Sequence, residues 1–317
     1  MRWLLALVLF ALTLPAEAQT YPDRPVRIVV GFGPGGVADI VARTVAPKLS
    51  EALGQQVIVE NRPSAGGIVA AGAVAKAEPD GHTLLLISGG NAVSSSLYKA
   101  LSYDPLGDFA MVSTLGFFDL AIAVDQSSSI TSLKDLIQAA KDKPGTINVG
   151  TIGIGSTQHL SAELFRSMAG INIVIVNYRA TPAVMLGLKG GEVQAAFEFL
   201  APLAGPIKQG SIRALGATNT KRSAMLPEVP TVSESGLAGY EATSWNGVAA
   251  PAKTPAPVIA KLNQELVKIV AMADVKAKLL ELGVEARSST PEWLRDYFVA
   301  ESKKWGQVIE KAGIEKQ

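Results

Sequence analysis

The chain has 317 residues, no cysteine, and 29 basic against 28 acidic side chains. This balance lacks the basic excess that binding to a phosphate backbone requires, so we expect no nucleic-acid partner. The absence of cysteine excludes disulfides, thiolate metal sites and cysteine nucleophiles, and leaves His82 and His159 as the two imidazoles for a zinc or serine enzyme. The length predicts about two domains of roughly 150 residues each.

The first 18 residues have the pattern of a secretory signal peptide. Arg2 precedes an apolar run over residues 4–14, and Pro15 then leads into the cleavage pattern A-x-A at residues 16–18. The run is shorter than the ~20 apolar residues that span a bilayer. We therefore expect cleavage near Ala18, export to the periplasm, and a mature protein that is not embedded in the membrane.

Beyond residue 18, short β-branched runs alternate with longer amphipathic segments, which is typical of an α/β fold. The first part predicts strands at residues 26–31, 56–60 and 83–88, and helices over residues 37–53 and 66–77. The second part predicts strands at residues 120–124, 147–150, 171–176, 193–199 and 212–218, with helices over residues 132–143 and 158–168. From Trp245 onward the pattern predicts helices over residues 256–272, 274–282 and 291–312.

One arrangement of strand, turn and helix occurs twice in this order of elements. A strand runs into a glycine-rich turn that opens a helix, once near residue 33 and once near residue 155. Two such turns predict two α/β lobes with a ligand held between them. The order of the elements assigns residues 19–122 and 245–317 to lobe 1, and residues 123–244 to lobe 2.

The first turn, from Gly31 to Gly36, fits the dinucleotide-binding pattern G-x-G-x-x-G. An exported dinucleotide enzyme is one hypothesis, although Pro34 stands where the backbone would approach a pyrophosphate and NAD would have to be found outside the cytoplasm. The more general interpretation is that backbone N–H groups at a helix N-terminus, free of side-chain bulk, bind a small anion such as a carboxylate. A tight turn without a ligand is the structural alternative.

The second turn places Gly155, Ser156 and Thr157 at the start of a helix. Either hydroxyl can act as a simple N-cap or can share the backbone amides with a carboxylate. His159 and Glu163 on the same helix are too few ligands for a metal. The catalytic patterns G-x-S-x-G, G-x-x-x-x-G-K-[ST] and H-E-x-x-H do not occur in the sequence. We therefore expect no metal, no cofactor and no catalysed reaction.

For each of three further residues, the sequence allows two interpretations. Arg179 follows a strand and could hold a carboxylate through two hydrogen bonds, or it could be a solvated loop arginine. Glu198 ends an apolar strand and could pair with a cation or face water. Trp245 could line a cleft or belong to the core near a hinge.

Several motifs together resemble the Bug family of periplasmic solute-binding proteins. They are PGG-x-x-D from Pro34, PDGHTLL from Pro79, and W-x-G-x-x-AP-x-x-TP from Trp245, and the resemblance covers essentially the whole chain after the signal peptide. It implies a type II periplasmic binding protein, whose two lobes close on a ligand like a Venus flytrap. It also implies delivery of that ligand to the membrane permease of a tripartite tricarboxylate transporter. We expect a monomer.

The resemblance assigns the ligand site to loops of both lobes, and four positions depart from the family pattern, one of them Lys253, where glycine is usual. Gly31 stands where proline is common, Ala180 where glycine is usual, and Glu198 where many members carry an aspartate that can bind an amino group. The expected ligand is a small organic carboxylate, either a di- or tricarboxylate or an aromatic carboxylate. A ligand sensor of the same fold that feeds a signalling receptor is the alternative. The predicted ligand-binding residues are Phe32, Gly33, Pro34, Gly35, Gly36, Ser88, Gly89, Asn91, Gly155, Ser156, Thr157, Tyr178, Arg179, Thr181, Glu198 and Trp245.

Overall fold

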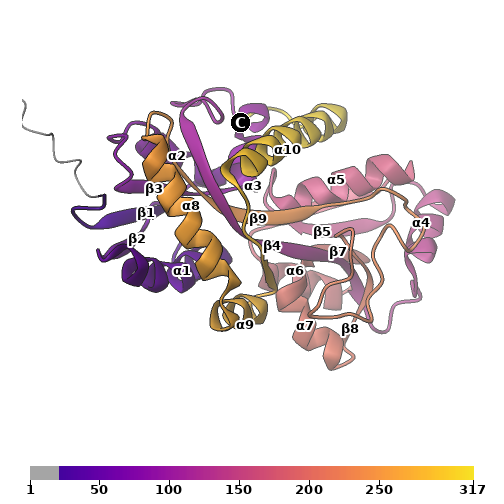
Figure 1. The fold of residues 1–317 in the computed structure, drawn as a ribbon. Coiled ribbons are helices and arrows are strands. Elements are labelled where there is room, and N and C mark those ends of the chain that lie inside the picture. The colour runs from indigo at the N-terminus through magenta and orange to yellow at the C-terminus, as the bar shows by residue number, and fades with distance from the viewer. Residues whose placement is uncertain (1–20) are drawn as a thin grey trace, which may run out of the picture.

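The computed structural model describes residues 21–317, so the predicted signal peptide lies outside the described residues. Two α/β lobes lie side by side, one built around the first strands of the chain and the other around its middle (Figure 1). The strands follow one hydrogen-bonded path: β2 (Val57–Asn61), β1 (Val26–Val30), β3 (Thr83–Ser88), β9 (Thr243–Pro251), β4 (Phe109–Asp125), β7 (Ala195–Phe199), β5 (Asn148–Ile152) and β6 (Val174–Tyr178). Two more strands, β8 (Ile212–Ala217) and β10 (Val284–Ala286), also pair with β4.

The long strand β4 is shared by both lobes. Up to Asp119 it pairs with β9, and from Leu120 onward it pairs with β7 and β8. The chain therefore enters the second lobe at Leu120 and returns through Thr243, the residue opposite Asp119. We call these three residues the crossing. The lobe boundaries expected from the sequence, at residues 122 and 245, stay predictions.

Helices cover the sheet in both lobes. The first lobe contains α1 (Val37–Leu53), the short helix η1 (Ala65–Gly67), α2 (Ile68–Ala75), α3 (Gly89–Leu97), α8 (Ala256–Ala271) and α9 (Ala273–Glu281). The second lobe contains α4 (Leu133–Asp142), α5 (Thr157–Ala169), α6 (Thr181–Lys189) and α7 (Leu200–Lys208). None of the helices within residues 21–317 combines the length and apolar character needed to span a membrane.

The last helix, α10 (Pro291–Ala312), reaches from the first lobe to the second (Figure 1). It packs on α3 and on α5. Trp305 and Ile309 of α10 share one buried cluster with Leu97 of α3 and Phe165 of α5. One apolar core therefore joins helices that lie far apart in the sequence and belong to different lobes.

Asp119 at the crossing is buried, with 8% of its surface exposed. Burial raises the pKa of this carboxyl to about 6, although the hydrogen bond from Asn219, 2.8 Å long, opposes the rise. The carboxylate of Glu285 adds to the rise, whereas Ser223 and Arg287 lower the pKa. Between about pH 4 and pH 6 the folded chain therefore binds a proton that the unfolded chain has released.

This proton makes the stability depend on pH. Because the folded state holds the extra proton, the free energy of unfolding should fall as pH rises from about 4 to about 6. Asp119→Asn should remove this contribution and raise the stability at pH 7 by roughly 2 kcal/mol, a little less than the pKa shift alone implies. Urea denaturation at pH 4.5, 6 and 7.5 measures the effect. An asparagine variant with the same pH slope as the parent chain would contradict this account.

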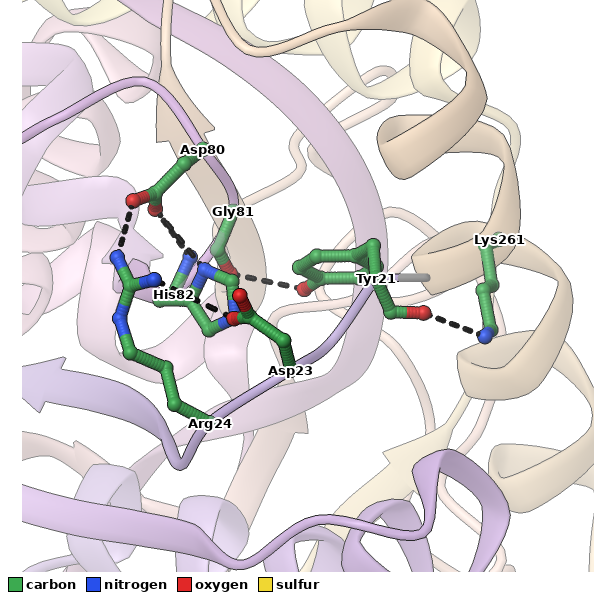
Figure 2. Close-up of polar contacts among 7 residues, drawn as sticks. All are labelled: Tyr21, Asp23, Arg24, Asp80, Gly81, His82 and Lys261. Atoms are coloured by element: carbon green, nitrogen blue, oxygen red, sulfur yellow. Dashed lines mark hydrogen bonds and ion pairs between the residues drawn. The ribbon is translucent and has the colours of Figure 1, made fainter. Parts of the chain in front are cut away.

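The described chain starts in a segment that His82 and its neighbours fasten to the first lobe (Figure 2). The imidazole lies between two carboxylates, with Nε2 3.1 Å from Asp23 and Nδ1 3.2 Å from Asp80. The ring of Tyr21 meets the imidazole edge to face at a centroid distance of 5.2 Å. The backbone oxygen of Tyr21 accepts a 2.7 Å hydrogen bond from Lys261. The histidine and aspartate of the PDGHTLL motif thus have a structural role.

Loss of the imidazole should weaken this anchor. His82→Ala leaves Asp23 without its buried partner and should lower the free energy of unfolding by about 1 to 2 kcal/mol. Arg24→Ala is the matched control, because the Arg24 side chain is 56% exposed and its 2.6 Å pair with Asp80 lies at the surface. Exposed ion pairs contribute at most about 1 kcal/mol. Thermal melts that rank the two variants the other way would show that His82 is not the anchor.

Candidate functional site

One cavity of about 540 Å³ lies between the lobes. The N-terminal residues of three helices form part of its wall, with α1 and α3 from the first lobe and α5 from the second. The predicted site residues that line it are Phe32, Gly36, Ser88, Gly89, Gly155, Ser156 and Thr157. The tertiary structure therefore brings both glycine-rich turns to the same space.

The N-terminus of α1 has no side-chain cap. Gly36 occupies the N-cap position in an extended conformation. The amides of the first helical turn of α1 therefore have no side-chain acceptor. Asp39 instead turns back and accepts a 2.9 Å hydrogen bond from the Gly35 amide. Burial alone would raise the pKa of Asp39, but hydrogen bonds from Arg43, Gly35 and Asn61 lower it on balance. Asp39 thus holds the turn from the side of the helix, and Gly36, Val37 and Ala38 at its start line the cavity.

The N-terminus of α3 carries its own capping box. The Ser88 amide donates a 2.9 Å hydrogen bond to Asn91 Oδ1, and Asn91 is buried. Beside this turn, the indole Nε1 of Trp245 is buried and finds no acceptor among the described residues. It lies 3.5 Å from the point where a Cβ on Gly89 would stand. Trp245 is fully buried in the core, with its one polar atom turned toward the α3 terminus.

The N-terminus of α5 is where the lobes touch. Ser156 is the N-cap, because its hydroxyl accepts a 3.1 Å hydrogen bond from the His159 amide and donates to the Ile152 carbonyl. Thr157 Oγ1 lies 3.4 Å from Ser244 Oγ on β9. Gly155 has φ of +79°, and a Cβ there would lie 2.3 Å from Leu97 of α3, so a side chain is excluded by both conformation and contact.

Two buried titratable groups stand behind the α5 terminus. Burial, helped by the charge of Arg166, lowers the pKa of His159 to about 4, so its imidazole is neutral at pH 7. Glu198 is fully buried, and its Oε1 accepts a 2.9 Å hydrogen bond from Gln158 Nε2, which itself lines the cavity. Glu198 Oε2 has no partner among residues 21–317. Within the same residues no group of acidic or histidine side chains has the arrangement of a metal site.

The remaining predicted residues do not line the cavity. Gly33, Pro34 and Gly35 form the outer part of the first turn. Tyr178 donates a 3.1 Å hydrogen bond to Glu192, and Arg179 is exposed. The physical reason is strand order: β6 is the edge strand beyond β5, so the loop that carries residues 178–181 starts one strand further from the cavity.

Sequence reasoning also missed part of the wall. Val93, Leu97, Phe118, Phe199 and Trp305 line the cavity but come from four separate elements, α3, β4, β7 and α10. Each lies in an ordinary apolar pattern with no local motif. Only the packing of α10 and α3 across the lobes, and the course of β4, brings them together.

The chain matches the model of the tripartite tricarboxylate transporter family receptor over residues 41–314. This chain belongs to that receptor family. The protein BugT of Bordetella pertussis is 34% identical over 301 residues, which are 94% of this chain and 92% of BugT. The expected resemblance to Bug proteins is confirmed.

Solved structures of similar receptors share the fold. R. palustris Rpa4515 with adipate is 34% identical, with a TM-score of 0.80 over 94% of this chain and 100% of that one. MatC (Rpa3494) from Rhodopseudomonas palustris, with bound malate, is 29% identical, with a TM-score of 0.76 over 91% of this chain and 100% of that one. The expected fold class, a two-lobed α/β periplasmic binding protein, is confirmed.

Proposed function

We propose that this receptor is an extracytoplasmic solute-binding protein that captures a small organic carboxylate in the cavity between its lobes. The observation that carries the proposal is the convergence of three helix N-termini on one cavity, with the first turn of α1 uncapped by any side chain. Free N–H groups at a helix start favour an anion. The adipate and malate in the structures of similar receptors support the ligand class.

In this proposal the contacts come from both lobes. The amides of the first helical turn of α1 hold a carboxylate, with Gly89 at the α3 terminus beside it, and Ser156 and Thr157 contribute from the second lobe. A ligand that touches both lobes binds best when they are closed, so it stabilises the closed state by the difference in contact energy. The protein catalyses no reaction and delivers its cargo unchanged.

The proposal includes export through the signal peptide and delivery to the permease of a tripartite tricarboxylate transporter. A sensor of the same fold that feeds a signalling receptor is the alternative. Deletion of the gene distinguishes them. A transport role predicts loss of uptake of the ligand, whereas a sensor role predicts normal uptake and loss of a ligand-induced response.

Thermal shift with the purified protein tests the ligand class. Monocarboxylates, dicarboxylates, citrate and aromatic acids are compared with sugars, amines and NAD at equal concentration. A ligand present at 100 times its Kd should add about 2.7 kcal/mol of stability. Stabilisation by at least one carboxylate is expected. Stabilisation only by sugars or amines would refute the proposal, and stabilisation only by NAD would favour the dinucleotide hypothesis.

A further inference from the structure

One part of the cavity is formed by aromatic rings from both sides of the crossing. Phe118 of β4 and Phe199 at the end of β7 meet edge to face, with ring centroids 5.3 Å apart. Phe32 of the first turn packs against the same core cluster. All three rings line the cavity, and Phe32 and Phe199 are only half-buried. The protein therefore leaves aromatic surface uncovered inside its binding space.

The side chains that line the cavity carry almost no charge, and the one that is charged is acidic. Among the described residues that line it, no side chain is a lysine, arginine or histidine, and Glu301 has the one formally charged side chain. The Glu301 carboxylate is buried, accepts a 2.8 Å hydrogen bond from Trp305 Nε1 and lies 3.4 Å from Lys304. A second carboxylate on a ligand would lack a cationic partner and would share the cavity with this negative charge. Burying an unpaired charge is strongly unfavourable.

We propose that the ligand is an aromatic monocarboxylate. This rests on the function proposed above: its single carboxylate lies at the helix N-termini, and its ring packs on Phe32, Phe118 and Phe199. An aromatic ring gains more here than an alkyl chain does, because ring pairs contribute beyond the area they bury. Since Phe118 belongs to lobe 1 and Phe199 to lobe 2, the ring also links the lobes and favours closure.

Calorimetry with matched ligands tests the inference. The ligand 4-methylbenzoate differs from terephthalate only in a methyl group that replaces the second carboxylate, and hexanoate differs from adipate in the same way. We expect 4-methylbenzoate to bind at least roughly ten-fold more tightly than terephthalate, a difference of about 1.4 kcal/mol, and more tightly than hexanoate. Equal or tighter binding of terephthalate or adipate would overturn the monocarboxylate assignment while leaving carboxylate capture intact.

A neutral analogue separates this inference from the function on which it rests. If 4-methylbenzamide binds as tightly as 4-methylbenzoate, the helix termini do not hold a carboxylate, and the proposed function fails. If none of the acids binds, both proposals fail. Tight binding of hexanoate together with weak binding of 4-methylbenzoate would refute only the aromatic preference.

Variants test the rings directly. Phe199→Ser should weaken binding of 4-methylbenzoate by roughly ten-fold and binding of hexanoate by less, because the alkyl chain loses apolar contact but no ring pair. Leu186→Ser is the control, since Leu186 of α6 is 72% exposed and does not line the cavity. Phe32→Ser serves as the second variant if Phe199→Ser does not fold. Unchanged affinity in a folded ring variant would refute the aromatic subsite.

Discussion

Replacing Val37 with proline should weaken binding of a carboxylate ligand by about ten- to hundred-fold, because a hydrogen bond to a charged group contributes about 1.5 to 3 kcal/mol. Val37 is the first residue of α1 and lines the cavity. Proline there removes one backbone N–H but suits the first helical position. Gly36 before it has φ of −75° and ψ of 165°, a conformation that a following proline allows. The melting temperature without ligand should stay close to that of the parent chain.

Val37→Ala is the matched control, because it loses the same side chain and keeps the amide. Isothermal titration calorimetry on the parent chain and the two variants separates the contribution of the Val37 side chain from that of its backbone amide. A proline variant that binds as well as the alanine variant would show that the amides of this turn do not hold the ligand. The proposed function would then lose the observation that carries it.

Gly247→Val should lower the free energy of unfolding by about 3 kcal/mol, at the upper end of the usual effect of overpacking a core. Gly247 lies in β9, within the W-x-G motif, and is paired with β4. A Cβ there would stand 2.9 Å from the Ser113 carbonyl oxygen and 3.2 Å from Leu294 of α10. Because one of these neighbours is backbone, the two strands must separate to admit a side chain.

Gly205→Val is the comparison for this substitution. Gly205 lies in α7 with no non-neighbouring atom within 4 Å of an added Cβ, so Gly205→Val should cost only about 1 kcal/mol, from the contact of the new side chain with the ring of Pro206. Chemical denaturation of both variants measures the difference. Equal stability of the two variants would mean that the glycine of the W-x-G motif has no packing role.

Local patterns in the sequence predicted the elements that bury a single continuous face. The strand–turn–helix units that contain β1 with α1, and β5 with α5, were predicted because apolar residues recur at the right period and glycine marks the turn. Helix α3, helix α7 and strands β9 and β10 were not predicted. Helix α3 begins with two glycines and contains three serines, which are weak helix formers. Strand β9 is buried along its whole length, so it shows no alternation.

The candidate site likewise has a part that local sequence patterns predict and a part that they do not. The turns at Gly36 and Gly155 could be predicted because their glycines and helix starts are local signals. The loop at Tyr178 also leads from a strand into a helix start, yet strand order places it outside the cavity. Sequence period cannot reveal which strand lies at an edge, because pairing depends on contacts between distant residues.

By itself, the sequence determined the family, the α/β class and the two glycine-rich turns at helix starts, since each depends on residues close together in the chain. Only the tertiary structure decided what else lines the cavity. The rings of Phe118 and Phe199 meet because β4 changes partner at the crossing, and Trp305 reaches the wall because α10 packs on α3. The proposed backbone capture of a carboxylate rests on local conformation, whereas the proposed selection of the rest of the ligand rests on side chains that only long-range packing brings together.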